Sequence, residues 1–159
     1  MSCLTFEKRM IRIGLLLFTL QVILAGCAMP RVIIYDDPLT YEEHLKLGMA
    51  YEKDREFENA IREYKTAARR LPIAYFYLGN VYFQKNELDQ AEKYYKKAIR
   101  KETHNADAHN NLAWLYYVKE ENLDKAENLA LRAMALDPSK RDVYMDTLDK
   151  VRELKERNN

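Results

Sequence analysis

Apolar residues recur at helical spacing along most of this chain, and one long apolar run lies near its start. From Tyr41 onward apolar positions return every three to four residues among charged ones, which is typical of amphipathic helices that bury one face. Thr40 followed by Glu43 forms a capping box before this pattern, so the first helix is predicted to begin at Tyr41. The pattern predicts an all-α fold over residues 40–157.

The long apolar run spans Ile13 to Gly26 and follows a basic stretch that ends at Arg12. Its 14 residues fall short of the roughly 20 that a membrane-spanning helix needs. A basic stretch before a short apolar run is typical of a secretory signal peptide, here residues 1–26. The run ends in Leu-Ala-Gly-Cys at residues 24–27, which resembles the bacterial lipobox. That resemblance implies cleavage between Gly26 and Cys27 and a lipid on the Cys27 thiol. The alternative is that Cys27 is a buried residue of an uncleaved helix.

A lipid-modified Cys27 is expected to hold the mature chain on a membrane, because two or more acyl chains give stable anchoring. Ala28 rather than aspartate follows the cysteine, and by analogy with the sorting rule of enteric bacteria this favours the periplasmic face of the outer membrane. Residues 27–39 are interpreted as a lipidated tether, which at about 3.3 Å per residue reaches roughly 40 Å. Cys3 lies in the segment expected to be removed, so we expect no intramolecular disulfide.

A set of landmark residues recurs three times between Tyr41 and Pro138. Each copy has a small residue with a leucine before it on a first helix, and alanines on a second helix. The copies hold Leu47, Gly48, Tyr51, Ala60, Tyr64, Ala67 and Pro72; Tyr75, Leu78, Gly79, Tyr82, Ala91, Tyr95 and Ala98; and His109, Leu112, Ala113, Tyr116, Ala126, Ala130, Ala133 and Pro138. This spacing resembles the tetratricopeptide-repeat (TPR) family, whose unit is a helical hairpin of about 34 residues. The resemblance implies a right-handed α-solenoid of three helix pairs within residues 40–138, at about 41–71, 72–105 and 106–138.

Two intervals depart from the regular period. Gly48 and Gly79 are 31 residues apart, three short of the period, so a shorter link between the first two repeats is predicted, with Pro72 as the first residue of the next helix. The third repeat carries one extra residue before Ala126, which predicts a longer turn at residues 119–123.

A closing helix is predicted at residues 139–157, after the third repeat. Ser139 is expected to cap it. Its expected apolar positions are Val143, Leu148, Val151 and Leu154. A repeat array needs such a terminal helix, because its last apolar face would otherwise meet water.

In TPR domains the first helices of successive pairs line a concave groove that takes peptides or partner helices, so the resemblance places function there. The groove residues carried over from the family are Leu45, Met49 and Glu52, then Phe76, Asn80 and Phe83, and then Asn110, Trp114 and Tyr117. Six of the nine are large and apolar, which is typical of a binding surface, and Asn80 and Asn110 are expected to bind a peptide backbone. The alternative is that these aromatic residues pack against the closing helix or against residues 31–35.

The family's clamp for two carboxylates uses Lys and Asn on the first helix of the array. Leu45 and Met49 stand there instead, so an apolar helix or extended segment is expected as ligand rather than an acidic tail.

Charge and composition exclude several other functions. The formal net charge is +1, and both signs are interspersed after residue 26, which argues against a nucleic-acid partner. His44, His104 and His109 are the only histidines and do not have the spacing of a metal site. The four glycines form no phosphate-binding loop. We therefore predict no enzyme, no catalytic or metal-binding residue, and no cofactor apart from the covalent lipid on Cys27.

These features together predict a lipid-anchored adaptor or assembly factor of the bacterial envelope. Its expected partner is an envelope protein or peptide segment held in the groove. By analogy it is similar to TPR lipoproteins that assist type IV pilus or secretin biogenesis, although one fold hosts many functions. The alternatives are a structural scaffold that self-associates through the groove, and a recruiter of peptidoglycan enzymes.

Overall fold

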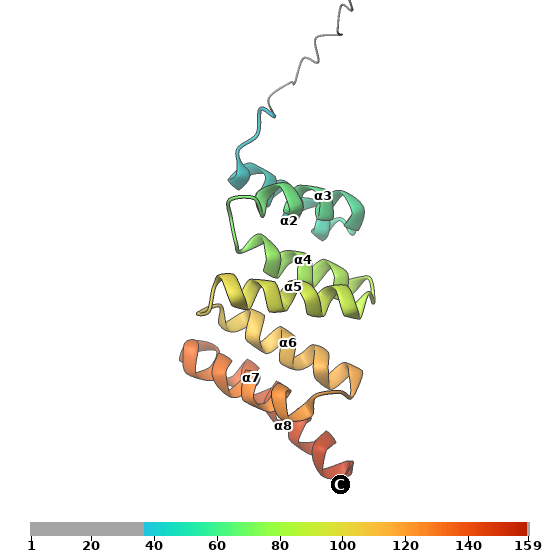
Figure 1. Ribbon diagram of the computed structural model, residues 1–159, viewed down its shortest axis with the longest axis vertical. Helices are drawn as coiled ribbons and strands as arrows, with labels where there is room; N and C mark the ends of the chain where they lie inside the picture. Colours follow the sequence, from blue (N-terminus) through green and yellow to red (C-terminus); the bar gives the residue numbers. More distant parts are fainter. Residues whose placement is uncertain (1–36, 159) are drawn as a thin grey trace, which may run out of the picture. The chain divides into compact units, whose positions relative to one another are not determined.

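The computed structural model describes residues 37–158, which form successive antiparallel helix pairs (Figure 1). Its elements are α2 (Tyr41–Lys53), α3 (Phe57–Ala67), α4 (Ala74–Gln84), α5 (Leu88–Lys101), α6 (Ala106–Lys119), α7 (Leu123–Leu136), the 3₁₀ helix η1 (Pro138–Lys140) and α8 (Arg141–Arg157). Each helix packs on the next along the chain, and α8 packs on both α6 and α7. The predicted all-α fold of three helix pairs and a closing helix is confirmed.

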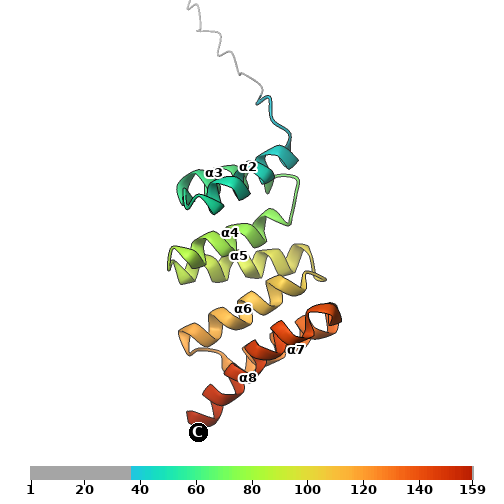
Figure 2. The same ribbon diagram turned by 180° about the vertical axis from the view of Figure 1, so that it is seen from behind.

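Residues 38–159 form a compact unit whose core is drawn from its own helices. Figures 1 and 2 show from opposite sides that the links between repeats lie along one edge of this unit, and the turns within repeats along the other. The predicted signal peptide and Cys27 lie outside the described residues. Within the described range, no helix is both long enough and apolar enough to cross a membrane.

The first helix begins as its capping box predicts. The Thr40 backbone N–H donates to the Glu43 carboxylate at 2.7 Å, and the Glu43 N–H donates to the Thr40 hydroxyl at 3.2 Å. These hydrogen bonds from Thr40 lower the pKa of Glu43 below its ordinary value, because they stabilise the ionised carboxylate. The N-terminus of α2 is thus capped by residues that lie within its own first turn.

The turns within the repeats use residues in the left-handed backbone region. Arg55 is the left-handed residue of the turn after α2, and Asn86 is that of the turn after α4. The third turn uses two, Glu120 and Asn122, with φ of 55° and 53°. By the helix bounds this turn, 120–122, has three residues, as do the turns 54–56 and 85–87, so the prediction of a longer turn was wrong. The extra residue lengthens α6 instead, which extends six residues past Ala113, whereas α4 extends five past Gly79.

The interval from Gly48 to Gly79 is three residues short of the period because helices α3 and α4 are short, and not because the link between them is short. Helices α3 and α4 have 11 residues each, whereas α5 and α6 have 14. The link 68–73 is longer than the link 102–105, so the prediction of a shortened link was wrong. Pro72 also lies two residues before α4 and does not begin it. Proline lacks an N–H and restricts the residue before it, so α3 cannot continue through this point.

Two glycines let the helices of the first two pairs approach closely. A Cβ atom added at Gly48 would lie 2.6 Å from the Tyr64 ring, and one added at Gly79 would overlap the Tyr95 ring. Both rings are buried, so neither can move aside easily. In the third repeat Ala113 and Ala130 occupy the corresponding positions. The first two pairs thus combine a glycine with a tyrosine, whereas the third combines two alanines.

The closing helix buries Leu148, Val151 and Leu154 as predicted, but Val143 is 61% exposed and Tyr144 is buried in its place. Tyr144 donates a hydrogen bond of 2.8 Å to Asp107 at the start of α6, which ties α8 to the third repeat.

Ser139 does not cap α8, contrary to the prediction. Asp137 accepts from the Ser139 N–H at 3.1 Å and from its hydroxyl, and these bonds begin η1. Asp137 has this role because it immediately precedes Pro138, where the helical turn starts. Helix α8 then continues from η1 without a side-chain cap of its own.

Candidate protein-binding groove

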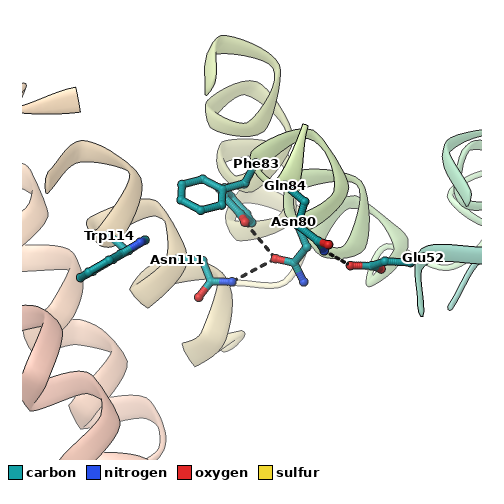
Figure 3. A pocket seen from close by; sticks show the side chains of 7 residues that line it. Glu52, Asn80, Phe83, Gln84, Asn111 and Trp114 are labelled. Atoms are coloured by element: carbon teal, nitrogen blue, oxygen red, sulfur yellow. Dashed lines mark hydrogen bonds between the residues drawn. The ribbon is translucent and has the colours of Figure 1, made fainter. Parts of the chain in front are cut away.

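The first helices of the three pairs line a groove with two adjoining hollows. One hollow, of about 250 Å³, is lined by Glu52, Asn80, Phe83, Gln84, Tyr95, Asn111 and Trp114, and is called the groove pocket below (Figure 3). The other, of about 440 Å³, is lined by Met49, Glu52, Lys53, Arg55, Tyr77 and Gln84. Glu52 and Gln84 contribute to both, so the two hollows are neighbours along one surface.

The structure brings five of the nine predicted groove residues to these hollows: Met49, Glu52, Asn80, Phe83 and Trp114. Leu45 and Phe76 instead lie half-buried against the core. Tyr117 lines a separate hollow with residues of α8.

Asn110 does not line the groove, contrary to the prediction. It is 8% exposed, and its side-chain oxygen has no hydrogen-bond partner among the described residues. Helix α6 packs on α5, α7 and α8, so more of its surface is buried than on a helix with an open face. The neighbouring Asn111 reaches the groove pocket in its place.

The sequence prediction missed six residues that line the hollows: Lys53, Arg55, Tyr77, Gln84, Tyr95 and Asn111. A recurring offset could have found most of them. Tyr77 and Asn111 each lie two residues before the small landmark of their helix, while Lys53 and Gln84 lie five residues after it. Both offsets lie on the groove side and were not among the positions carried over from the family.

Helix α8 covers part of the third repeat, as the alternative interpretation of the aromatic residues expected. The Lys150 ammonium of α8 lies 5.3 Å from the centre of the Trp114 ring. The ring of Tyr117, which is on α6 like Trp114, lies 5.0 Å from the Trp114 ring, centre to centre. The first and second repeats stay open, since Met49 is 44% exposed and Gln84 is exposed as well. Any cover from residues 31–35 lies outside the described residues.

A ladder of hydrogen bonds crosses the groove from repeat to repeat (Figure 3). The Glu52 carboxylate accepts from the Tyr64 hydroxyl and from the Gln84 amide, each at 2.6 Å. The Asn80 oxygen accepts from the Tyr95 hydroxyl at 2.9 Å and from the Asn111 amide at 3.0 Å. Because each bond fixes the side chains that it joins, the polar groups of the groove are preorganised.

Glu52 also contributes a negative charge to the groove. Burial raises the pKa of Tyr64 above its ordinary value, and the hydrogen bond to Glu52 and the charge of Glu52 raise it further. Burial raises the pKa of Tyr95 as well; the Asn111 hydrogen bond opposes this shift and the Glu52 charge adds to it. The negative potential of Glu52 therefore extends from the first repeat to the second.

The histidines have structural surroundings. His44 is buried and its Nδ1 lies 2.7 Å from the Glu63 carboxylate, while His109 is buried beside the Asn105 carbonyl. His104 is exposed. In the part of the chain that the structure describes, no three His, Cys, Asp or Glu side chains lie close enough to hold a metal ion.

Family models for the tetratricopeptide repeat match residues 45–103 and 82–145. The helical unit is a TPR domain. Solved structures agree with this assignment. MamA is 26% identical, with a TM-score of 0.57 over 77% of this chain and 82% of MamA. The TPR2B domain of yeast Sti1, solved with pHsp70, is 17% identical, with a TM-score of 0.67 over 71% of this chain and 96% of that one. The type III secretion chaperone SycD of Yersinia enterocolitica, solved with a peptide of the translocator YopD, is 15% identical, with a TM-score of 0.65 over 74% and 94%.

One curated relative is the human protein O-mannosyl-transferase TMTC2, which is 30% identical over 100 residues. The match covers 59% of this chain and 12% of that protein. The chain therefore spans a small part of this relative's length, and the similarity concerns the repeats alone.

Proposed function

We propose that this protein is a lipid-anchored adaptor or assembly factor that binds an envelope protein or peptide segment in the groove of its TPR domain. The observation that carries the proposal is the groove pocket, which is open and combines fixed polar groups with the Trp114 and Phe83 rings. Aromatic anchors beside directional hydrogen-bonding groups are typical of protein-binding sites. The Sti1 and SycD structures, each solved with a partner or a partner's peptide, support the same use of the fold.

The membrane anchor in this proposal is the lipid on Cys27. It is supported by the signal-peptide layout of residues 1–26 and by the small residues before the cysteine. Lipidation would keep the TPR domain within the reach of residues 27–39 from the membrane, on the periplasmic face of the outer membrane. We favour a role in type IV pilus or secretin biogenesis, by analogy with TPR lipoproteins of this kind.

Replacing Cys27 with serine is expected to release the protein from the membrane fraction, because serine cannot take the thioether-linked lipid. Intact-mass measurement of the membrane-extracted protein should show a chain that begins at Cys27 and carries acyl groups. The matched control is Cys3→Ser, which should leave both the mass and the membrane fraction unchanged, since residue 3 is removed with the signal peptide. A Cys27→Ser protein that stays in the membrane fraction would contradict the lipid anchor.

Photocrosslinking in cells tests the adaptor function. A photoreactive amino acid at Gln84 or Met49 should capture one envelope protein, because both side chains are exposed in the groove. The control positions are Lys65 and Arg132, which are exposed on the second helices of their pairs. Capture of a second copy of this chain would favour the scaffold alternative. Equal capture from groove and control positions would refute groove binding.

A further inference from the structure

The hydrogen-bond ladder fixes which groups of the groove pocket remain available to a ligand. A carboxylate can only accept hydrogen bonds, so Gln84 must turn its NH₂ group toward Glu52, which leaves the Gln84 oxygen as an acceptor. Asn111 gives its NH₂ group to the Asn80 oxygen, which leaves the Asn111 oxygen as an acceptor too. The Asn80 NH₂ group makes neither of these bonds, and the second N–H of each bonded amide and the Trp114 indole N–H are further donors. The pocket therefore presents two amide oxygens and the Glu52 carboxylate as acceptors beside these donors.

The pocket also carries a negatively charged group. Glu52 is the one acidic or basic side chain among its seven lining residues. Its hydrogen-bond donors, Tyr64 and Gln84, are both neutral. The nearby cations are Lys53 and Arg55, which line the neighbouring hollow that Glu52 shares, and Lys150, which lies 5.3 Å from the Trp114 ring; none of the three donates a hydrogen bond to Glu52. A carboxylate held between neutral donors favours a cationic ligand group and disfavours an anionic one.

Two aromatic rings complete the lining. Phe83 and Trp114 stand beside the acceptors, and Figure 3 shows them in the same pocket as Asn111. A volume of about 250 Å³ lies just below the usual range of roughly 300–1,000 Å³ for small-molecule sites, so the pocket suits one side chain of a longer ligand.

We propose that the groove pocket receives an arginine side chain of the bound protein segment. A guanidinium group has five N–H donors and no acceptor, and its plane stacks on aromatic rings, so it matches the acceptors, the charge and the rings together. A lysine ammonium would satisfy the charge but is a compact, strongly hydrated group that cannot stack in this way. The Asn80 NH₂ group then donates to a backbone carbonyl of the same segment. This inference rests on the proposed function, because it needs a segment bound in the groove.

Selection from a random-peptide library displayed on phage tests the proposal. The TPR domain, which has a core of its own, is compared with its Glu52→Gln variant and with the matched control Glu87→Gln, in which an exposed turn residue loses the same charge. Peptides selected on the wild type and on Glu87→Gln are expected to be enriched in arginine, and those selected on Glu52→Gln are not. In the best selected peptide, replacing arginine by uncharged citrulline should weaken binding about tenfold or more, followed by the fluorescence of Trp114, the one tryptophan of the chain.

The outcomes separate this inference from the proposed function. Peptides that bind the wild type without arginine enrichment, or that lose nothing on the change to citrulline, overturn the arginine pocket and leave groove binding intact. Equal arginine enrichment on all three proteins overturns the role of Glu52 and with it the inference. A library that yields no binding peptide on any of the three proteins counts against groove binding itself.

Discussion

Replacing Leu148 with alanine is expected to lower the free energy of unfolding by about 2–5 kcal/mol, the range found for large-to-small changes in packed cores. Leu148 is 2% exposed and belongs to the face of α8 that closes the last repeat, together with Tyr144 and Val151. Its loss leaves a cavity between α8 and the third helix pair. Urea unfolding followed by circular dichroism measures the change. The fluorescence of Trp114, which lies beside Lys150 of α8, reports whether this end of the array unfolds first.

The matched control lies on the same helix. Val143 is 61% exposed, so Val143→Ala is expected to change the free energy of unfolding by no more than about 0.5 kcal/mol. The sequence pattern had assigned Val143 and Leu148 to the same apolar face, so the pair tests which residues of α8 face the array. Equal destabilisation by the two substitutions would show that α8 packs in a different rotation.

Replacing Gly79 with alanine is expected to destabilise the domain by about 1–3 kcal/mol, the usual cost of overpacking a core. Alanine favours a helix over glycine by about 1 kcal/mol, so helix propensity alone predicts the opposite sign. The clash of the new Cβ atom with the buried Tyr95 ring decides the outcome. Denaturant unfolding of the single variant measures the net effect.

A double-mutant cycle identifies the cause. In a Tyr95→Ala background the obstructing ring is gone, so Gly79→Ala should become neutral or stabilising. The third repeat is the natural precedent, because it combines Ala113 with Ala130 at these two positions. A Gly79→Ala penalty that persists without the Tyr95 ring would mean that another contact, and not this one, excludes the methyl group.

Several features of the groove followed from sequence spacing alone. Met49, Glu52, Asn80, Phe83 and Trp114 reach the hollows because a regular helix carries a given offset from the landmark residue to the same face. The offset three residues before the small landmark failed in all three repeats, since Leu45 and Phe76 lie against the core and Asn110 is buried. On α6 the closing helix also covers part of the surface, and spacing within one helix contains no information about that extra partner.

Residue types and their spacing along the chain determined most of the fold. The Thr40 capping box and the recurring glycine and alanine landmarks depend on residue types at fixed spacing, so the sequence by itself determined the helices, their pairing and their number. Only the tertiary structure decided three other features. It decided that α3 and α4 are short rather than the link between them, that Tyr144 is buried in place of Val143, and which way each amide in the groove points. The physical reason is that a hydrogen-bond ladder such as Glu52–Gln84 or Asn80–Asn111 joins residues about one repeat apart, and its directions depend on which neighbour can only accept.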